Sequence, residues 1–326
     1  IYIYYNMYNL TAGPIKMEDS LTNCKQPVPH RSKLFENLYK KIKNNISLLL
    51  NSDKEHSCVI IPGSGTLGVE CLISNYLVHK KSLFISNGTF GDKWIKIGKI
   101  YNKNIKTYIK PINQNLNYKE IEEIIKKENI ETILFVYHET SCCILNNIIK
   151  LNKICKKYNV DMVVDAVSAI GVIDINLQNL SQISFITFSS NKGLLSYPGI
   201  SFIVGKNKKF KECKNYEKKS FYLDINNYIE YSKLNQTPTT PAVNVIETTN
   251  KSIESIIQTS NYSKYKELNK YIIDEMKKIS ISHIDVKDKF YFCTNFWYPK
   301  IINENEFFSY LESKNIFLYK CKGELM

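Results

Sequence analysis

Glycine and hydroxyl residues crowd one short segment of the chain. It reads Gly63-Ser64-Gly65-Thr66-Leu67-Gly68 and follows an apolar run at 57–62. Backbone N–H groups at the start of a helix, together with the Ser64 and Thr66 hydroxyls, can bind a phosphate group. The G-x-G-x-x-G spacing also occurs in dinucleotide-binding domains, so a nicotinamide dehydrogenase is the first alternative. A Gly/Ser turn at a helix start can also be only a helix cap.

The dinucleotide interpretation needs an acidic residue about 20 positions farther on, where the next strand ends, to bind the ribose. In this chain that strand ends Ile85-Ser86-Asn87-Gly88, and the next carboxylate is Asp92. The phosphate-binding part of the motif is therefore present and the dinucleotide part is not.

A carboxylate and a lysine follow two later apolar runs. Asp165 ends DMVVD (161–165), and Lys192 comes after ISFITF (183–188) and several small residues. A carboxylate where a buried strand ends lies at the ligand-binding edge of an open α/β sheet, although a helix cap or a loop contact is an equal alternative. A lysine whose ammonium form is disfavoured is a competent Schiff-base nucleophile, whereas a solvated loop lysine is the ordinary alternative.

In combination, these three sites match what pyridoxal phosphate requires. The glycine segment would hold the phosphate, Asp165 would keep the pyridine nitrogen protonated so that the ring acts as an electron sink, and Lys192 would form the Schiff base. The sequence therefore predicts a pyridoxal-phosphate-dependent enzyme with Lys192 as the residue that binds the cofactor covalently.

Seven short apolar runs, separated by helical patterns, would position these residues. Most are apolar on consecutive positions, as expected for strands buried on both faces of a parallel sheet. The predicted strands are 57–62, 82–86, 107–111, 132–137, 161–165, 183–188 and 200–205. Helical patterns such as 118–127 and 146–157 lie between them, so we expect a doubly wound α/β fold with a mostly parallel seven-stranded sheet.

The pattern changes after about residue 205. Helices are predicted at 224–233, 243–258, 262–279 and 305–314, and strands at 291–298 and 316–320. We therefore expect an N-terminal arm over 1–30, a large cofactor-binding domain over 31–235 and a smaller C-terminal α+β domain over 236–326. The chain stops at GELM without a closing helix, which predicts that the small domain is truncated.

Composition argues against several other classes of protein. The 326 residues are 44% apolar, as in globular proteins, and contain no run of about 18 apolar residues that would span a membrane. The start lacks the features of a signal peptide, so the cytoplasm is the expected compartment. The net charge of +13 comes from lysines spread along the chain with a single arginine, Arg31, which argues against a nucleic-acid surface. The nine cysteines lack metal-site spacing and are expected to be ordinary thiols.

From Leu10 onward the chain resembles the class V (fold type I) aminotransferases. The resemblance rests on a set of motifs that follow one another in the order typical of that family. They are Leu10-Thr11-Ala12-Gly13-Pro14, His30-Arg31-Ser32, Gly63-Ser64-Gly65-Thr66, Asn87-Gly88-Thr89-Phe90-Gly91, Glu139-Thr140-Ser141, Asp165-Ala166-Val167-Ser168, Ser190-Asn191-Lys192 and Thr237-Pro238-Thr239-Thr240-Pro241-Ala242-Val243. It implies the pyridoxal-phosphate transferase fold of type I.

The resemblance assigns the cofactor's main contacts. It implies that Ser64, Gly65 and Thr66 hold the phosphate. It also implies that Phe90 stacks on the pyridine ring and that Asp165 pairs with the ring nitrogen. Phe90 could instead be an ordinary core residue.

Further roles follow from the same resemblance. Thr140 or Ser141 would lie near the O3′ side of the cofactor, and Ser168 would help a loop to close over the site. Lys192 would be both the Schiff base and the proton shuttle. Thr240 would contact the phosphate bound by a partner subunit, which implies a homodimer with shared active sites.

The chain departs from the family's pattern at three points. The family usually has glycine at the position of Cys143 and proline at that of Asn147. It also binds the substrate carboxylate with an arginine late in the chain, whereas Arg31 is the only arginine here. Lysine replaces such an arginine poorly. Either that segment is missing or the protein is catalytically impaired.

The implied reaction moves an amino group from a small amino donor to a small 2-oxo acid such as pyruvate or glyoxylate. The donor would be 2-aminoethylphosphonate, alanine or serine. Asn191 favours the phosphonate enzyme, while Leu223-Asp224 and Gln236-Thr237-Pro238 also fit the alanine–glyoxylate branch. The alternatives are a cysteine desulfurase or other lyase of the same fold, in which histidine usually precedes the lysine, and an impaired homologue that acts as a binding protein.

Overall fold

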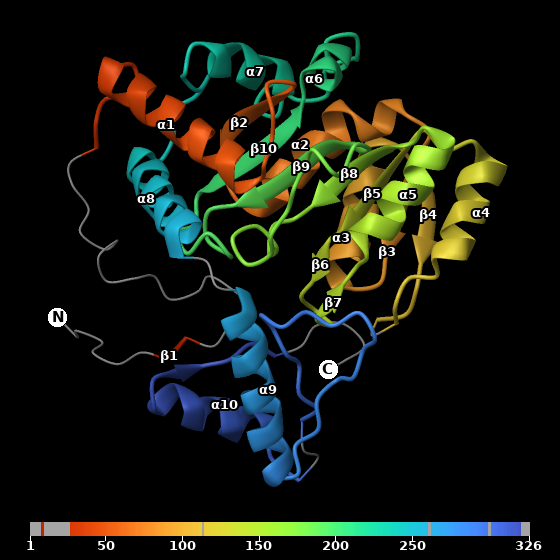
Figure 1. The fold of residues 1–326 in the computed structure, drawn as a ribbon, viewed down its shortest axis with the longest axis vertical. Helices are drawn as coiled ribbons and strands as arrows, with labels where there is room; N and C mark the ends of the chain where they lie inside the picture. The colour runs from red at the N-terminus through yellow and green to blue at the C-terminus, as the bar shows by residue number, and fades with distance from the viewer. Residues whose placement is uncertain (1–7, 10–26, 113, 260–261, 299–300, 321–326) are drawn as a thin grey trace.

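A seven-stranded sheet forms the centre of the computed structural model, which describes residues 8–9, 27–112, 114–259, 262–298 and 301–320. Across the sheet the order is β2 (His56–Pro62), β10 (Ile200–Lys206), β9 (Ile183–Ser189), β8 (Asp161–Asp165), β5 (Thr132–Val136), β3 (Ser82–Ser86) and β4 (Lys106–Ile109). Of these strands only β10 is reversed, pairing antiparallel with β2 and β9, while the other neighbours pair in parallel (Figure 1). The predicted strands and the mostly parallel sheet are confirmed, with ends that agree to within two residues.

Helices cover both faces of the sheet and make two hydrophobic cores. The first core is shared by α1 (Lys33–Leu49), α4 (Tyr118–Glu128), α5 (Ile148–Tyr158) and α8 (Val243–Thr259). The second is shared by α2 (Gly65–Asn75), α3 (Thr89–Tyr101), α6 (Asn207–Cys213) and α7 (Ile225–Lys233). Strand residues alternate between the cores, since Phe135 of β5 lies in the first and its neighbour Leu134 in the second.

Helix α5 shows how the local sequence sets the ends of an element. The Asn147 side chain accepts a hydrogen bond from the Lys150 backbone N–H at 2.9 Å and caps the helix start. Asn159 ends the helix with φ 54°, a left-handed conformation that asparagine tolerates. Asn147 stands where the resembled family usually has proline, and its side chain supplies a helix start of its own.

The C-terminal elements gather below the sheet in Figure 1. They are α9 (Tyr262–Lys278), α10 (Glu304–Ser313) and β11 (Ile316–Phe317), the last of which pairs in parallel with β1 (Tyr8–Asn9). Within the described residues no helix combines the length and the apolar character needed to cross a membrane. The motif at 10–14 and the GELM end lie outside the described residues.

The predicted strand at 291–298 is wrong, and the one at 316–320 shortens to β11. In the first segment only Phe296 makes a bridge, an isolated one with His283. Its aromatic residues contribute packing instead, because the Phe292 ring meets Tyr265 edge-on at 5.0 Å. The alternating aromatic residues of 291–298 therefore gave a strand-like pattern, although this segment forms only the isolated bridge at Phe296.

Helix α8 follows the predicted domain boundary at 235/236, yet its Ile246 and Ile253 are buried in the core of the sheet. Helix α8 also packs against α1. The proposed division at 235/236 therefore stays a prediction, and a division after α8 would keep this core whole.

The cap of α5 gives a test of this local reasoning. Asn147→Ala should lower the free energy of unfolding by about 1 kcal/mol, because the Lys150 N–H loses its acceptor. Asn147→Asp keeps an acceptor at the helix start and should retain the wild-type value. Urea unfolding of the three proteins measures this, and equal stability of the alanine and aspartate variants would contradict the assignment.

Candidate active site

Strand ends, loops and helix starts at one edge of the sheet carry most of the predicted site residues. β2, β3, β5, β8 and β9 run in the same direction, so they end at a common edge, called here the carboxyl edge. Asp165 is the last residue of β8, and Thr140, Ser141, Ser168 and Lys192 lie in the connections that follow β5, β8 and β9. Ser64 directly precedes α2, Gly65 and Thr66 lie in the first turn of α2, and Phe90 lies in the first turn of α3. All of the predicted residues except Thr240 therefore come to this edge.

Asp165 is the buried carboxylate of the site, only 3% exposed. Its Oδ2 accepts a hydrogen bond from the Trp94 indole N–H at 2.8 Å, and its Oδ1 accepts one from the Val167 backbone N–H at 2.9 Å. Burial raises the pKa of Asp165 to about 6, although these two donors and the nearby Lys192 ammonium act in the opposite direction. Asp165 is thus a carboxylate held in a fixed orientation beside positive charge.

The start of α2 lies beside the loop that follows Asp165. Ser64 is exposed at the N-cap and makes no side-chain capping bond, while the Thr66 hydroxyl accepts a hydrogen bond from the Lys93 ammonium at 2.7 Å. A Cβ on Gly65 would come within 2.8 Å of the Val167 side chain, so glycine permits this close approach. The helix dipole, two hydroxyls and an ammonium together favour an anion here.

Helix α3 is held at the carboxyl edge by a buried carboxylate. The Oε2 atom of Glu139 accepts the backbone N–H groups of Phe90 and Gly91, each at 3.1 Å. The Ser141 hydroxyl donates to Glu139 Oε1 at 2.6 Å and accepts the Thr89 N–H at 3.0 Å. Burial raises the pKa of Glu139 to about 7 despite these donors. Ser141, predicted to lie near the cofactor, thus caps α3 together with Glu139.

The first turns of α3 present three side chains toward the site. Phe90, Lys93 and Trp94 follow helical i, i+3, i+4 spacing, and so they lie on one face of the helix. Lys93 reaches Thr66 and Trp94 reaches Asp165. Sequence reasoning found Phe90 but missed the other two, although their spacing from Phe90 was a visible signal.

Lys192 lies in a tight connection between β9 and β10. Its carbonyl accepts the Leu195 N–H at 2.9 Å, and the Ser190 hydroxyl donates to the Tyr197 carbonyl at 2.6 Å. Any Cβ on Gly193 would overlap the Ile170 carbonyl oxygen, so this connection packs directly on the loop after β8. The half-buried Lys192 is therefore anchored by backbone contacts on both sides.

A short hairpin links the carboxyl edge to the C-terminal part of the chain. It is formed by β6 (His138–Glu139) and β7 (Ile144–Leu145). Burial, and to a smaller extent Lys192, lowers the pKa of His138 to about 3, so its imidazole is neutral, and the His138 carbonyl accepts the Ser168 hydroxyl at 2.9 Å. Cys143 has φ 56°, a conformation that suits the glycine usual in the resembled family.

Two cysteines, which the sequence predicted to be ordinary thiols, bring the hairpin and the C-terminal part of the chain together. The sulfur atoms of Cys143 and Cys293 are 3.1 Å apart, and the Asn295 amide donates to the Ser141 carbonyl at 2.8 Å. The segment predicted as a strand at 291–298 thus lies against the hairpin.

Arg31 and Thr240 lie outside this cluster. The Arg31 guanidinium donates to the Gln236 side chain and to the Thr237 carbonyl, both at 2.8 Å, and lies over the Tyr231 ring. The chain's single arginine thus fixes the segment between α7 and α8. Thr240 is exposed at the end of that segment.

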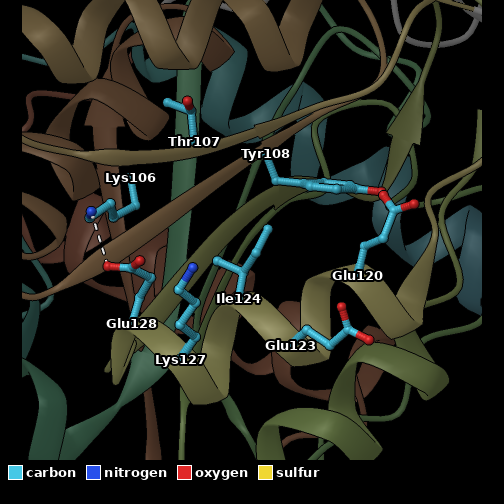
Figure 2. Close-up of a pocket in the computed structure, with 8 residues that line it drawn as sticks. All are labelled: Lys106, Thr107, Tyr108, Glu120, Glu123, Ile124, Lys127 and Glu128. Carbon is cyan, nitrogen blue, oxygen red and sulfur yellow. Dashed lines mark hydrogen bonds and ion pairs between the residues drawn. The ribbon is translucent and has the colours of Figure 1, made fainter.

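A surface hollow of about 460 Å³ lies elsewhere, between the edge strand β4 and α4 (Figure 2). Two pairs of its lining side chains are bonded to each other: Lys106 to Glu128 at 3.0 Å, and the Tyr108 hydroxyl to Glu120 at 2.7 Å. This hollow is a solvated surface groove and does not contain any of the predicted site residues.

Comparison with known proteins identifies the family. A family model described as aminotransferase class-V matches residues 11–324. The chain is 25% identical over 242 residues to the soluble hydrogenase 42 kDa subunit of Anabaena cylindrica, covering 72% of this chain and 62% of that protein. It is also 25% identical over 278 residues to a 2-aminoethylphosphonate–pyruvate transaminase of Bacillus mycoides, covering 82% and 75% respectively.

A solved structure shows the same fold. The alanine–glyoxylate aminotransferase of Nostoc sp. superposes with a TM-score of 0.90 at 19% identity, over 100% of this chain and 89% of that one. The α/β fold expected from the strand pattern is therefore confirmed, and the family expected from the motifs is confirmed by the match to residues 11–324. The chain belongs to the class V aminotransferase family.

Proposed function

We propose that this chain is a transaminase in which Lys192 binds pyridoxal phosphate covalently and an amino group passes from a small amino donor to a small 2-oxo acid. One observation carries the proposal: an uncapped helix start, a buried carboxylate and a lysine meet at one edge of the sheet. These are the three groups that fit the phosphate, the ring nitrogen and the aldehyde carbon of this cofactor.

The phosphate fits the start of α2. Ser64, Gly65 and Thr66 would supply backbone N–H groups and hydroxyls, and the Lys93 ammonium already lies 2.7 Å from the Thr66 hydroxyl. A positive charge at this point favours a dianion at the helix start. Lys93 was not predicted, and its position strengthens the proposed phosphate site.

The ring fits between α3 and the end of β8. Phe90 would stack on the ring and Asp165 would bind its nitrogen, with Thr140 or Ser141 toward O3′ and Ser168 holding the adjoining loop through the His138 carbonyl. When bound, pyridoxal phosphate supplies an electron sink for the negative charge that develops on the donor's α-carbon.

Lys192 would hold and move the reacting proton. Once the donor's amine has displaced it, the Lys192 amine can accept the proton from the donor's α-carbon. The neighbouring His138 is neutral because burial lowers its pKa to about 3, so it adds no positive charge next to that amine. A neutral neighbour does not oppose the positive charge that Lys192 gains when it accepts this proton.

The proposed donors are 2-aminoethylphosphonate, alanine and serine. The Bacillus mycoides relative is named for the first of them and the Nostoc structure for alanine and glyoxylate. We further propose a cytoplasmic homodimer in which Thr240, exposed beyond the segment that Arg31 anchors, reaches the phosphate site of a second copy.

Absorbance tests the covalent bond. The purified chain with added pyridoxal phosphate should show a band at roughly 410–430 nm. Lys192→Ala should abolish this band, whereas Lys126→Ala, at an exposed position of α4, should keep it. Absence of the band in the wild-type chain would refute the proposal. Titration of the loaded protein with the three donors should bleach the band only for a true substrate.

A desulfurase of the same fold is the second candidate, and one observation favours it. Cys293 lies beside Cys143, and its pKa is held below the ordinary value by that thiol and by the Lys192 ammonium. Such a thiol could attack the sulfur of a cysteine substrate, forming a persulfide on Cys293 while the electron pair of the broken C–S bond stays on the substrate carbon. Sulfide release from cysteine in the presence of an added thiol reductant, lost in Cys293→Ser, would establish this candidate, whereas sulfide release that survives Cys293→Ser would exclude a role for this thiol.

Asp165 should make stability depend on pH. Its pKa rises from an ordinary 3.8 to about 6 on folding, so ionisation costs stability as the pH rises through this window. Asp165→Asn removes this loss, so the unfolding free energy of the cofactor-free wild type should fall relative to the variant by up to about 1.4 kcal/mol per pH unit between roughly pH 4 and 6.

Asp285→Asn is the control for this measurement. Asp285 is exposed, and its pKa is lowered by its bond to Lys289, so its stabilising contribution is lost only below this window. Urea unfolding at several pH values measures all three proteins. A difference between wild type and Asp165→Asn that does not change with pH would contradict the expected burial of charge.

A further inference from the structure

Trp94 is a buried tryptophan with a single polar atom, and that atom is committed to Asp165. The side chain is 3% exposed, and its Nε1–H donates to Asp165 Oδ2 at 2.8 Å. An indole nitrogen is a donor only, and when buried it requires an acceptor. The two groups therefore satisfy each other away from solvent.

The second oxygen of the carboxylate is also fixed. Asp165 Oδ1 accepts the Val167 backbone N–H at 2.9 Å. Two donors on different oxygens, one from α3 and one from the chain after β8, set the plane of the carboxylate. One lone pair on each oxygen remains for a further donor.

The position of Trp94 is itself determined by the carboxyl edge. Glu139 binds the first N–H groups of α3, and Lys93, the neighbour of Trp94, donates to Thr66 at the start of α2. Helix α3 is thus tied to the phosphate site by one residue and to the carboxylate by the next.

We propose that Trp94 is a positioning residue: its indole N–H orients the Asp165 carboxylate toward the pyridine nitrogen of the cofactor and favours the ionised form of that carboxylate. The inference rests on the proposed function for the identity of the cofactor. The coupling between Trp94 and Asp165 is a property of the chain itself and can be measured without cofactor.

The groups that face Asp165 come from three other elements. Lys192 after β9 and Lys93 on α3 stabilise its charge, while Glu139 of β6 opposes it. A pH-dependent change in Trp94 fluorescence could arise from either carboxyl group. Separate variants at Asp165 and Glu139 therefore assign it.

Tryptophan fluorescence gives the first test, because the chain has only two tryptophans. Trp297→Phe removes the other one, which is 45% exposed, and leaves Trp94 as the sole emitter. In the cofactor-free chain its emission should change with pH around a midpoint near 6. The transition should vanish in Trp297→Phe/Asp165→Asn and persist in Trp297→Phe/Glu139→Gln. Emission that is independent of pH, or a transition that survives Asp165→Asn, overturns the inference.

Carbon-13 NMR gives the second test. The Asp165 carboxyl resonance, assigned by its loss in Asp165→Asn, should titrate in Trp94→Phe with a midpoint raised by roughly half a unit or more, because a donor to the ionised form is gone. A residue that only fills space would leave this midpoint unchanged, even if the variant were less stable.

Cofactor affinity separates this inference from the proposed function. Trp94→Phe should weaken binding of pyridoxal phosphate about tenfold, the usual effect of losing one hydrogen bond to a charged group. It should leave binding of the analogue with CH in place of the ring nitrogen nearly unchanged. Equal weakening for both ligands overturns the inference alone. Failure of the wild-type chain to bind either ligand overturns the proposed function.

Discussion

The hydrogen bonds between Glu139 and the first turn of α3 hold the candidate site together. Glu139 lies in β6, which follows β5, and its carboxylate accepts N–H groups of a helix that begins after β3. It therefore adds a side-chain link between the segments that follow the paired strands β3 and β5. These bonds fix where the first turn of α3 begins at the carboxyl edge. The N–H groups of Phe90 and Gly91 have no acceptor within the helix, because they lie in its first turn. Loss of the Glu139 carboxylate would therefore leave these N–H groups without their acceptor and would also shift the helix.

Folding buries two carboxyl groups at the carboxyl edge, and burial disfavours their charged form. Asp165 and Glu139 are both buried, and burial raises the pKa of each. The hydrogen-bond donors around each carboxylate replace only part of the solvation that water would provide. A bound group with a protonated ring nitrogen would complete the environment of Asp165. Perturbed pKa values cluster at functional sites, and here both belong to carboxylates at the carboxyl edge.

The strands and the place of Lys192 at the sheet edge could be predicted because they depend on local pattern. Runs such as 161–165 are apolar on consecutive residues, and parallel strands end at one edge, so Asp165 and Lys192 were placed together without any tertiary information. Contacts such as those of Trp94 and Lys93 could not be predicted, since they depend on the angle at which α3 packs. The segment 291–298 failed for a related reason: its alternating aromatic residues satisfy the strand pattern, while only tertiary contacts reveal that their partners are side chains rather than a neighbouring strand.

The reversed strand β10 has a consequence for how Lys192 is carried. If the strand after β9 ran parallel to it, the chain would have to return to the other end of the sheet through a crossover connection, usually a helix. Lys192 would then lie at the start of that long connection. Because β10 turns back at once, the residues that flank Lys192 are locked on both sides by a ladder in which Ser201 faces Ser189. The connection that carries Lys192 therefore begins and ends in two strands that are hydrogen-bonded to each other. The backbone on either side of Lys192 is therefore joined directly to the sheet, and the place of its amine depends on the side-chain rotamer.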